Sequence, residues 1–192
     1  MTAILMDRHN AKLFAGEELY ELNGLWTQTI SRNRDVISQS DRPLTSQERT
    51  EAHLVFGPGL DYSTIRITED ALLGAGGTAR TLPSGINFPV GASTSSGYVL
   101  WLIHELTHCW QYQHGRSIFA TATRALLCWA GMSSYDYGGQ PALVAAAAAS
   151  RGLSSFNTEQ QGDIARSYYR DLKAGASVAA YAPFLTEFRT PP

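Results

Sequence analysis

Five residues near the middle of the chain, His104-Glu105-Leu106-Thr107-His108, form the sequence HExxH. On a helix, residues four apart lie on one face, so the two imidazoles can bind one metal ion. Glu105 is one position further on and can face a metal-bound water, whose pKa zinc lowers to about 7. A carboxylate beside that water can take its proton. The motif therefore predicts a Zn²⁺ site for peptide-bond hydrolysis, with His104 and His108 as ligands and Glu105 as general base.

A catalytic zinc needs a third protein ligand, and Glu159 is the first of two candidates. It begins the segment Glu159-Gln160-Gln161-Gly162-Asp163, in which a second acid follows one helical turn later. This spacing fits a metal-binding carboxylate together with an acid that accepts a hydrogen bond from a ligand imidazole. Without a metal, the same pattern is an exposed acidic pair on an amphipathic helix. We predict Glu159 as the third ligand and Asp163 as the residue that orients a histidine.

His114 is the other candidate, because it follows His104 by ten residues, as the third histidine does in HExxHxxGxxH metzincins. Met132 lies downstream, where a Met-turn would be sought. The metzincin glycine that turns the chain is replaced by Gln111. Without that turn the helix continues, and His114 projects about 120° away from the metal-binding face. The sequence therefore favours Glu159 over His114.

Local patterns predict the elements that must carry these residues. We expect helices over residues 46–56, 98–113, 118–130, 141–150 and 159–173, and strands over residues 62–68 and 86–90. The HExxH motif falls inside the helix 98–113. Pro89 suits an edge position in a sheet, because proline donates no hydrogen bond. A few strands followed by several helices indicate an α+β fold, with a small sheet packed on the long HExxH helix and further helices C-terminal to it.

Two details of these helices are also expected from the residue types. Ser95 or Ser96 can cap the helix 98–113, and Gly115 can end it. The alanine run 145–149 is a strong helix former and predicts a close-packed part of the core.

Length and charge limit the classes of protein to consider. A chain of 192 residues is one domain or a domain with a tail. We assign residues 44–192 to the domain and residues 1–43 to an N-terminal extension that is partly disordered or covers the cleft. Fifteen basic and seventeen acidic residues give a net charge of −2, which leaves no electrostatic footprint for nucleic acid.

Targeting signals and cysteines indicate the compartment. The apolar runs are far shorter than the roughly 20 residues that span a bilayer, and residues 1–10 are not a signal peptide. Cys109 and Cys128 do not make a disulfide framework, which favours a reducing compartment. We expect a cytoplasmic protein with no membrane partner, unless it is exported by a route that needs no cleaved signal.

The segments His104–Gln111, with the sequence HELTHCWQ, and Glu159–Asp163, with the sequence EQQGD, resemble zincin metallopeptidases of the gluzincin type. Within that type they are most similar to small bacterial Vgr-related proteins and to the metallopeptidase-like core domain of contractile injection systems. Residues 44–67 are also similar to the helix and strand with which those domains begin. The resemblance covers residues 44–175 and leaves the first forty residues unaccounted for.

This resemblance implies a zincin-like fold in which His104, His108 and Glu159 hold Zn²⁺. It implies Glu105 as general base, Asp163 as the acid that orients an imidazole, and an extended peptide added to the edge strand Ile86–Val90. Gluzincins usually add a tyrosine or histidine that stabilises the oxyanion. Four residues are open for that role: Tyr135, Tyr137, Tyr168 and His114.

Two functions are therefore expected from different classes. The first is a zinc-dependent endopeptidase that acts on a peptide or protein substrate. The alternative is a non-catalytic zincin-fold component, or a toxin-associated protein, of a bacterial secretion or contractile injection apparatus, which would supply its partner. An intact Glu105 favours the enzyme, because a structural zinc site needs no general base.

Overall fold

The computed structural model describes residues 39–69, 78–83, 85–115 and 135–192. The helix expected over residues 118–130, the candidate Met-turn at Met132, and Cys128 lie outside the described residues. So does nearly all of the expected extension 1–43. Its last five residues form a strand.

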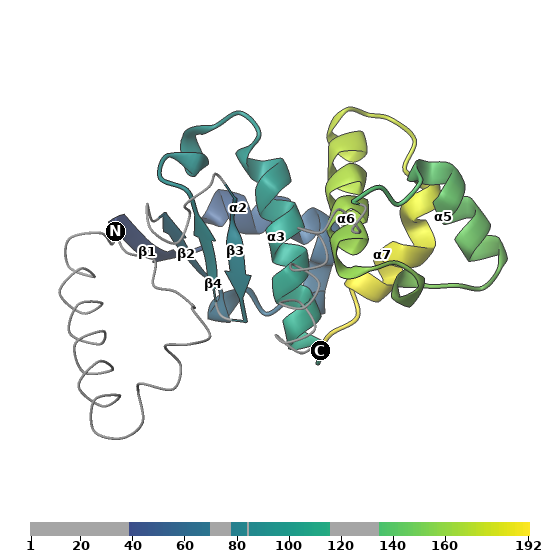
Figure 1. The fold of residues 1–192 in the computed structure, drawn as a ribbon, viewed down its shortest axis with the longest axis horizontal. Coiled ribbons are helices and arrows are strands. Elements are labelled where there is room, and N and C mark those ends of the chain that lie inside the picture. Colours follow the sequence, from purple (N-terminus) through teal and green to yellow (C-terminus); the bar gives the residue numbers. More distant parts are fainter. Residues whose placement is uncertain (1–38, 70–77, 84, 116–134) are drawn as a thin grey trace, which may run out of the picture. The chain divides into compact units, whose positions relative to one another are not determined.

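Within the described residues, four short strands make one sheet with the order β1-β2-β4-β3 (Figure 1). Strand β1 (Gln39–Pro43) runs antiparallel to β2 (Arg66–Glu69), and β2 runs parallel to β4 (Gly85–Phe88). Strand β4 in turn runs antiparallel to β3 (Arg80–Leu82). The outer strands of the sheet are therefore β1 and β3.

The prediction that residues 86–90 form an edge strand was wrong. Strand β4 lies inside the sheet, paired on both sides, and β3 is the outer strand. Pro89 follows the last residue of β4, so its missing N–H lies beyond the ladder and gives no information about the strand's position. The strand expected over residues 62–68 is shorter than predicted, because Tyr62–Thr64 form a 3₁₀ turn capped by the Asp61 side chain.

Helix α2 (Ser46–Phe56) begins as predicted, with a capping box between Thr45 and Glu48. Glu48 also joins the strand and helices around it. Its carboxylate accepts hydrogen bonds from Arg42 of β1 at 2.7 and 2.8 Å and from the Tyr98 hydroxyl at 2.6 Å. Burial alone would raise the pKa of Glu48, but these hydrogen bonds outweigh it and lower the pKa to about 2. The N-terminal end of the next helix is thereby tied to β1 and α2.

Helix α3 (Tyr98–Gln113) lies between the sheet and the C-terminal helices (Figure 1). Its bounds are those expected, and Gly115 follows it with φ +83°. The expected serine cap is absent: the N-cap is Gly97, which has no side chain, and the Tyr98 N–H bonds the Ser95 carbonyl instead. The helix is buried on most of its circumference from Leu102 onward, because elements pack against it from two sides.

The described residues after α3 form the helices α5 (Gly139–Ala148), α6 (Thr158–Lys173) and α7 (Ala182–Phe188). Helix α6 packs along α3, and α7 contacts α2 through the perpendicular pair Phe56 and Phe188. The described part of the chain also contains 3₁₀ turns at Gly57–Gly59, Tyr62–Thr64, Ala92–Thr94, Leu153–Ser155 and Ala179–Tyr181. A small sheet with packed helices confirms the α+β class.

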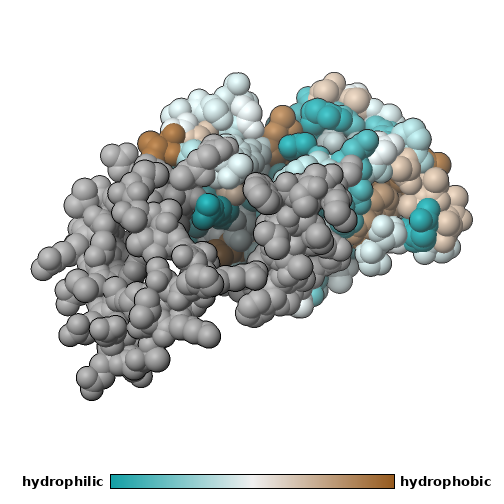
Figure 2. Space-filling model, viewed as in Figure 1, coloured by the Kyte–Doolittle hydropathy of each residue, from teal (hydrophilic) through white to brown (hydrophobic). Residues whose placement is uncertain are grey.

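The expectation that the alanine run 145–149 is core was wrong. Only Ala146 is buried, while Ala145, Ala148 and Ala149 are exposed, as is the neighbouring Val144. Figure 2 shows mostly pale and tan atoms at the end of the molecule where Figure 1 places α5. High helix propensity here determines the conformation but not the burial. In the part of the chain that the structure describes, we find no helix of the length and apolar character that a bilayer crossing requires.

Candidate metal centre

The two histidines of the HExxH motif lie one turn apart on α3. Their ring centroids are 5.1 Å apart, and the ring planes are inclined by 77°. His104 and His108 are 5% and 6% exposed, so both imidazoles are held in the interior. The helical spacing therefore brings the two rings to one side of α3, as the sequence predicts.

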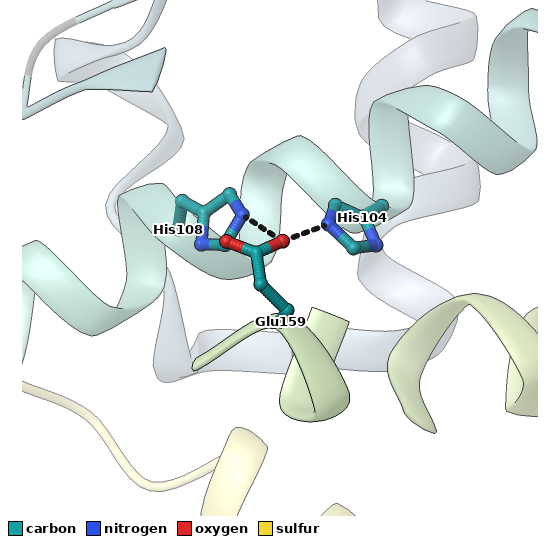
Figure 3. Close-up of side chains that lie close together, drawn as sticks. All are labelled: His104, His108 and Glu159. Atoms are coloured by element: carbon teal, nitrogen blue, oxygen red, sulfur yellow. Dashed lines mark hydrogen bonds and ion pairs between the residues drawn. The ribbon is translucent and has the colours of Figure 1, made fainter. Parts of the chain in front are cut away.

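Glu159 comes to the same point from the first turn of α6. Helix α6 begins there because Asn157 and Gln160 form a capping box, which satisfies the free backbone N–H groups. The Glu159 Oε2 atom lies 3.2 Å from His104 Nε2 and 3.5 Å from His108 Nε2 (Figure 3). We call His104, His108 and Glu159 the His–His–Glu cluster. Each of the three residues offers one ligand atom, and these three atoms all lie within 4.8 Å of one another.

The second nitrogen of His104 is held by Asp163, one turn after Glu159 on α6. Asp163 Oδ1 accepts a hydrogen bond of 2.9 Å from His104 Nδ1, and the other oxygen of Asp163 accepts one from Arg166 at 2.9 Å. Because an ionised carboxylate only accepts, Nδ1 must carry the hydrogen. Nε2 is then the nitrogen that faces Glu159, and it is the one left to bind a metal.

The cluster stabilises positive charge at the point where its three side chains meet. Burial disfavours the charged form of His104, but hydrogen bonds to Asp163 and Glu159 outweigh this and raise its pKa to about 9. Burial raises the pKa of Glu159, and the hydrogen bonds from the two histidines lower it well below its ordinary value. Two imidazoles and a carboxylate are also the donor set of catalytic zinc. The residues present therefore fit the metal that the sequence predicts.

Glu105 is buried beside the cluster, on the side of α3 toward the sheet. Its Oε2 accepts a hydrogen bond of 2.5 Å from the Thr81 hydroxyl of β3, and its Oε1 accepts one of 3.1 Å from Trp101 Nε1. Both oxygens are thus held by donors, which fixes the orientation of this carboxylate. The link to Thr81 also puts this carboxylate next to the outer strand of the sheet.

His114 lies apart from the cluster, as the continuous helix predicts. It is the C-cap of α3, with Nδ1 at 2.8 Å from the Trp110 carbonyl oxygen and Nε2 at 3.0 Å from that of Thr190. Its ring stacks on Trp110 at a centroid distance of 4.3 Å. Both ring nitrogens are therefore engaged at the end of the helix, and the arrangement of a third ligand histidine is not formed.

Among the candidates for the oxyanion role, Tyr135 is the one whose ring lies next to the cluster, 6.0 Å from that of His104. The Tyr137 hydroxyl instead lies 3.3 Å from that of Tyr181, and the Tyr168 hydroxyl accepts a hydrogen bond from Arg189 at 3.4 Å. Tyr135 is also half exposed, so a substrate can reach it.

The sequence reasoning missed the residues that hold these groups in place. Thr81 and Trp101 orient Glu105, while Gln111 and Gln161 are buried behind His108. Trp101 four residues before Glu105 and Gln111 three residues after His108 have helical spacings that could have indicated contact. Thr81 gives no local signal, because its contact depends on how the sheet packs against α3.

Gly162 allows α6 to approach His104 closely. A Cβ at this position would lie 2.6 Å from His104 Cε1. The His104 ring cannot move away from that Cβ without losing its hydrogen bond to Asp163 or to Glu159. Alanine ordinarily stabilises a helix interior by about 0.5–1 kcal/mol over glycine, but here we expect Gly162→Ala to lower the unfolding free energy and to weaken zinc binding about 10–100-fold. Urea unfolding and a chelator-competition titration measure the two effects.

Gly97→Ala is the matched control, because a Cβ there would meet no atom within 4 Å. We expect it to change the unfolding free energy by no more than about 0.5 kcal/mol and to leave zinc affinity unchanged. Unchanged zinc affinity in Gly162→Ala would contradict the close packing of α6 on His104.

Comparisons with known proteins show which proteins this chain is similar to. No protein-family model matches the chain. Among curated proteins, the chain is similar to the type VI secretion system spike protein VgrG2b of Pseudomonas aeruginosa, with 27% identity over 162 residues. The match covers 77% of this chain and only 15% of the spike protein.

A solved structure gives a consistent result. The chain is similar to the effector domain of Pseudomonas aeruginosa VgrG2b, with a TM-score of 0.57 and 29% sequence identity. That match covers 75% of this chain and 82% of the effector domain. The resemblance to Vgr-related proteins is thereby confirmed. The names of these relatives specify neither a metal nor a reaction.

Proposed function

We propose that this chain is an effector-type domain of a bacterial secretion apparatus that hydrolyses peptide bonds with zinc in a zincin-like fold. One observation carries the enzymatic part of the proposal. The His–His–Glu cluster has the donors of a catalytic zinc site, and the carboxylate of Glu105 is held beside it. The comparisons support the association with a secretion apparatus.

In this proposal His104, His108 and Glu159 would hold Zn²⁺, which activates water and polarises the carbonyl of the substrate. Glu105 would accept a proton from the attacking water at its carboxylate and would later donate it to the leaving amine. Asp163 keeps the hydrogen of His104 on Nδ1. Tyr135, the tyrosine beside His104, donates a hydrogen bond to the oxyanion.

Strand β3 is the element best suited to bind an extended peptide. Among the described strands it pairs only with β4, so its other edge can add a strand from a substrate. Thr81 in the centre of β3 bonds the carboxylate of Glu105. A peptide added to β3 would therefore pass next to the proposed base. We propose β3 for the role that the sequence assigned to residues 86–90.

A second candidate function is that of a non-catalytic component of the same apparatus. The similarity to a spike protein and to its effector domain favours an association with secretion whether or not the chain hydrolyses anything. The two candidates differ in their need for Glu105. A domain that serves only for docking needs no carboxylate positioned by two donors.

Removal and return of the metal test the enzymatic proposal. The purified chain is treated with a chelator, dialysed, and reloaded with one equivalent of zinc, and each form is incubated with unfolded casein. Mass spectrometry of the products should show new peptides with the untreated and reloaded forms, and none with the metal-free form. Full cleavage by the metal-free form would exclude the mechanism, and zinc binding without any cleavage would favour the docking function.

A further inference from the structure

Two glutamine side chains are buried directly behind His108. Gln111 comes from α3 and is 2% exposed, and Gln161 comes from α6 and is completely buried. Gln111 Oε1 lies 3.0 Å from His108 Nδ1. Gln111 Nε2 donates to the Thr158 carbonyl oxygen at 3.0 Å and to Gln161 Oε1 at 2.9 Å. The two amides therefore connect His108 to the start of α6.

At the other end of this connection, the Gln161 side chain is bonded to the backbone. Gln161 Nε2 donates to the carbonyl oxygens of Leu153 and Phe156, at 2.8 and 2.9 Å. Carbonyl oxygens only accept hydrogen bonds, so the NH₂ group of Gln161 must face them and its Oε1 must face Gln111. The orientation of the Gln161 amide is thus fixed by two carbonyl oxygens, which can only accept hydrogen bonds.

The orientation of Gln161 determines that of Gln111, and Gln111 in turn determines which nitrogen of His108 carries a hydrogen. Gln111 faces two acceptors, Thr158 O and Gln161 Oε1, so its NH₂ group points to them. A reversed amide would set its oxygen against two other oxygens. Its own Oε1 is left to face His108 Nδ1 and can only accept. Nδ1 of His108 must therefore carry a hydrogen, and Nε2 is the nitrogen that faces Glu159 and is left to bind a metal.

We propose that Gln111 and Gln161 are positioning residues, an amide relay that fixes the tautomer and ring orientation of His108 for metal binding. The proposal rests on the proposed His–His–Glu metal centre. His104 is oriented by an anionic partner, Asp163, whereas His108 is oriented by a neutral amide that is itself anchored on backbone carbonyls. The relay thereby orders the second imidazole without adding another buried negative charge.

Zinc affinity of single variants tests the relay. Gln111→Met and Gln161→Met replace each amide by an unbranched apolar side chain of similar length that suits a buried site. We expect Gln111→Met to weaken zinc binding about 10–100-fold and Gln161→Met about 10-fold, measured by competition with a chelator. Because the two amides act in series, the double variant should bind zinc about as weakly as Gln111→Met alone.

Gln113→Met is the matched control on the same helix. Its side chain also makes hydrogen bonds with an adjacent loop, to Asp61 and Thr64, but none of these reaches His108. We expect its zinc affinity to stay within about twofold of the wild-type value. Loss of affinity in Gln113→Met equal to that in Gln111→Met would overturn the proposal, because the effect would then be one of general stability.

A spectroscopic readout separates positioning from simple support of the fold. Long-range ¹H–¹⁵N spectra of the zinc-loaded protein with labelled histidine should show His108 bound through Nε2, with a slowly exchanging proton on Nδ1. In Gln111→Met that proton should exchange faster or the ring should bind through Nδ1. An unchanged His108 signal and unchanged affinity in Gln111→Met overturn the relay. If Gln111→Met does not fold, the same two measurements on Gln161→Met test the relay.

The outcomes also separate this inference from the proposed function. A wild-type chain that binds no zinc would overturn both the metal centre and the relay. Wild type and both methionine variants binding zinc equally well would overturn the relay alone and leave the centre in place. Weakened zinc binding in the variants supports the relay even if casein is not cleaved, because affinity is measured without turnover.

Discussion

Glu105→Gln should abolish hydrolysis and keep zinc in place. Glutamine has the same shape as glutamate, and its oxygen can still accept a hydrogen bond from Thr81 or Trp101. It cannot take a proton from water, so the general-base step is lost and we expect kcat to fall about 10³-fold. Glu105 is outside the His–His–Glu cluster, so zinc affinity should change little. Casein cleavage and metal content measured on the same preparation give both numbers.

Glu51→Gln is a suitable control, because Glu51 is a glutamate on α2 that bonds Lys173 and Tyr169. Its replacement should leave hydrolysis and zinc content unchanged. Hydrolysis near the wild-type rate in Glu105→Gln would show that Glu105 is not the base. Loss of zinc from Glu105→Gln would mean that this carboxylate holds the site together.

Glu159→Ala should weaken zinc binding by about 10³-fold, equivalent to ~4 kcal/mol. The variant leaves two imidazoles without the carboxylate that lies 3.2 and 3.5 Å from their Nε2 atoms. It also removes the negative charge that balances the metal in a buried site. A competition titration with a chelator of known affinity measures the change.

His114→Ala tests the alternative third ligand under the same conditions. His114 contacts the carbonyl oxygens of Trp110 and Thr190 at the end of α3, so its loss should leave zinc affinity unchanged. The opposite pattern, with zinc lost from His114→Ala and retained by Glu159→Ala, would restore the metzincin-like arrangement.

The parts of this protein that local sequence determines were predictable. Helix α3 has the expected bounds, and α2 and α6 begin within one residue of the expected positions, after the capping residues Thr45 and Asn157. These signals act over a few residues, so a single sequence contains them. The meeting of His104, His108 and Glu159 was also expected, because a known motif connects two segments that are 51 residues apart along the chain.

Features that depend on distant packing were not predictable in this way. The position of β4 inside the sheet depends on β2 and β3, and Pro89 was misleading because it lies just outside the ladder. The alanine run on α5 has a composition that suits core and surface equally well. The burial of Gln111 and Gln161 requires the docking of α6 on α3, which no pattern within either helix specifies.

The relation to a secretion spike suggests how the two expected functions fit together. The alternative function, an apparatus-associated protein, is the one that the similarity to VgrG2b supports. Hydrolysis rests on the site itself. A single domain can serve both, if the apparatus delivers it and the zinc centre acts on the target.

A crystal structure of the zinc-loaded chain, with anomalous data collected at the zinc edge, tests the proposed metal centre. We expect one zinc bound by Nε2 of His104, Nε2 of His108 and the carboxylate of Glu159, with water as the fourth ligand near Glu105. That open position is the mark of a catalytic site. Zinc absent from this cluster, or closed off by a fourth protein side chain, would contradict the account.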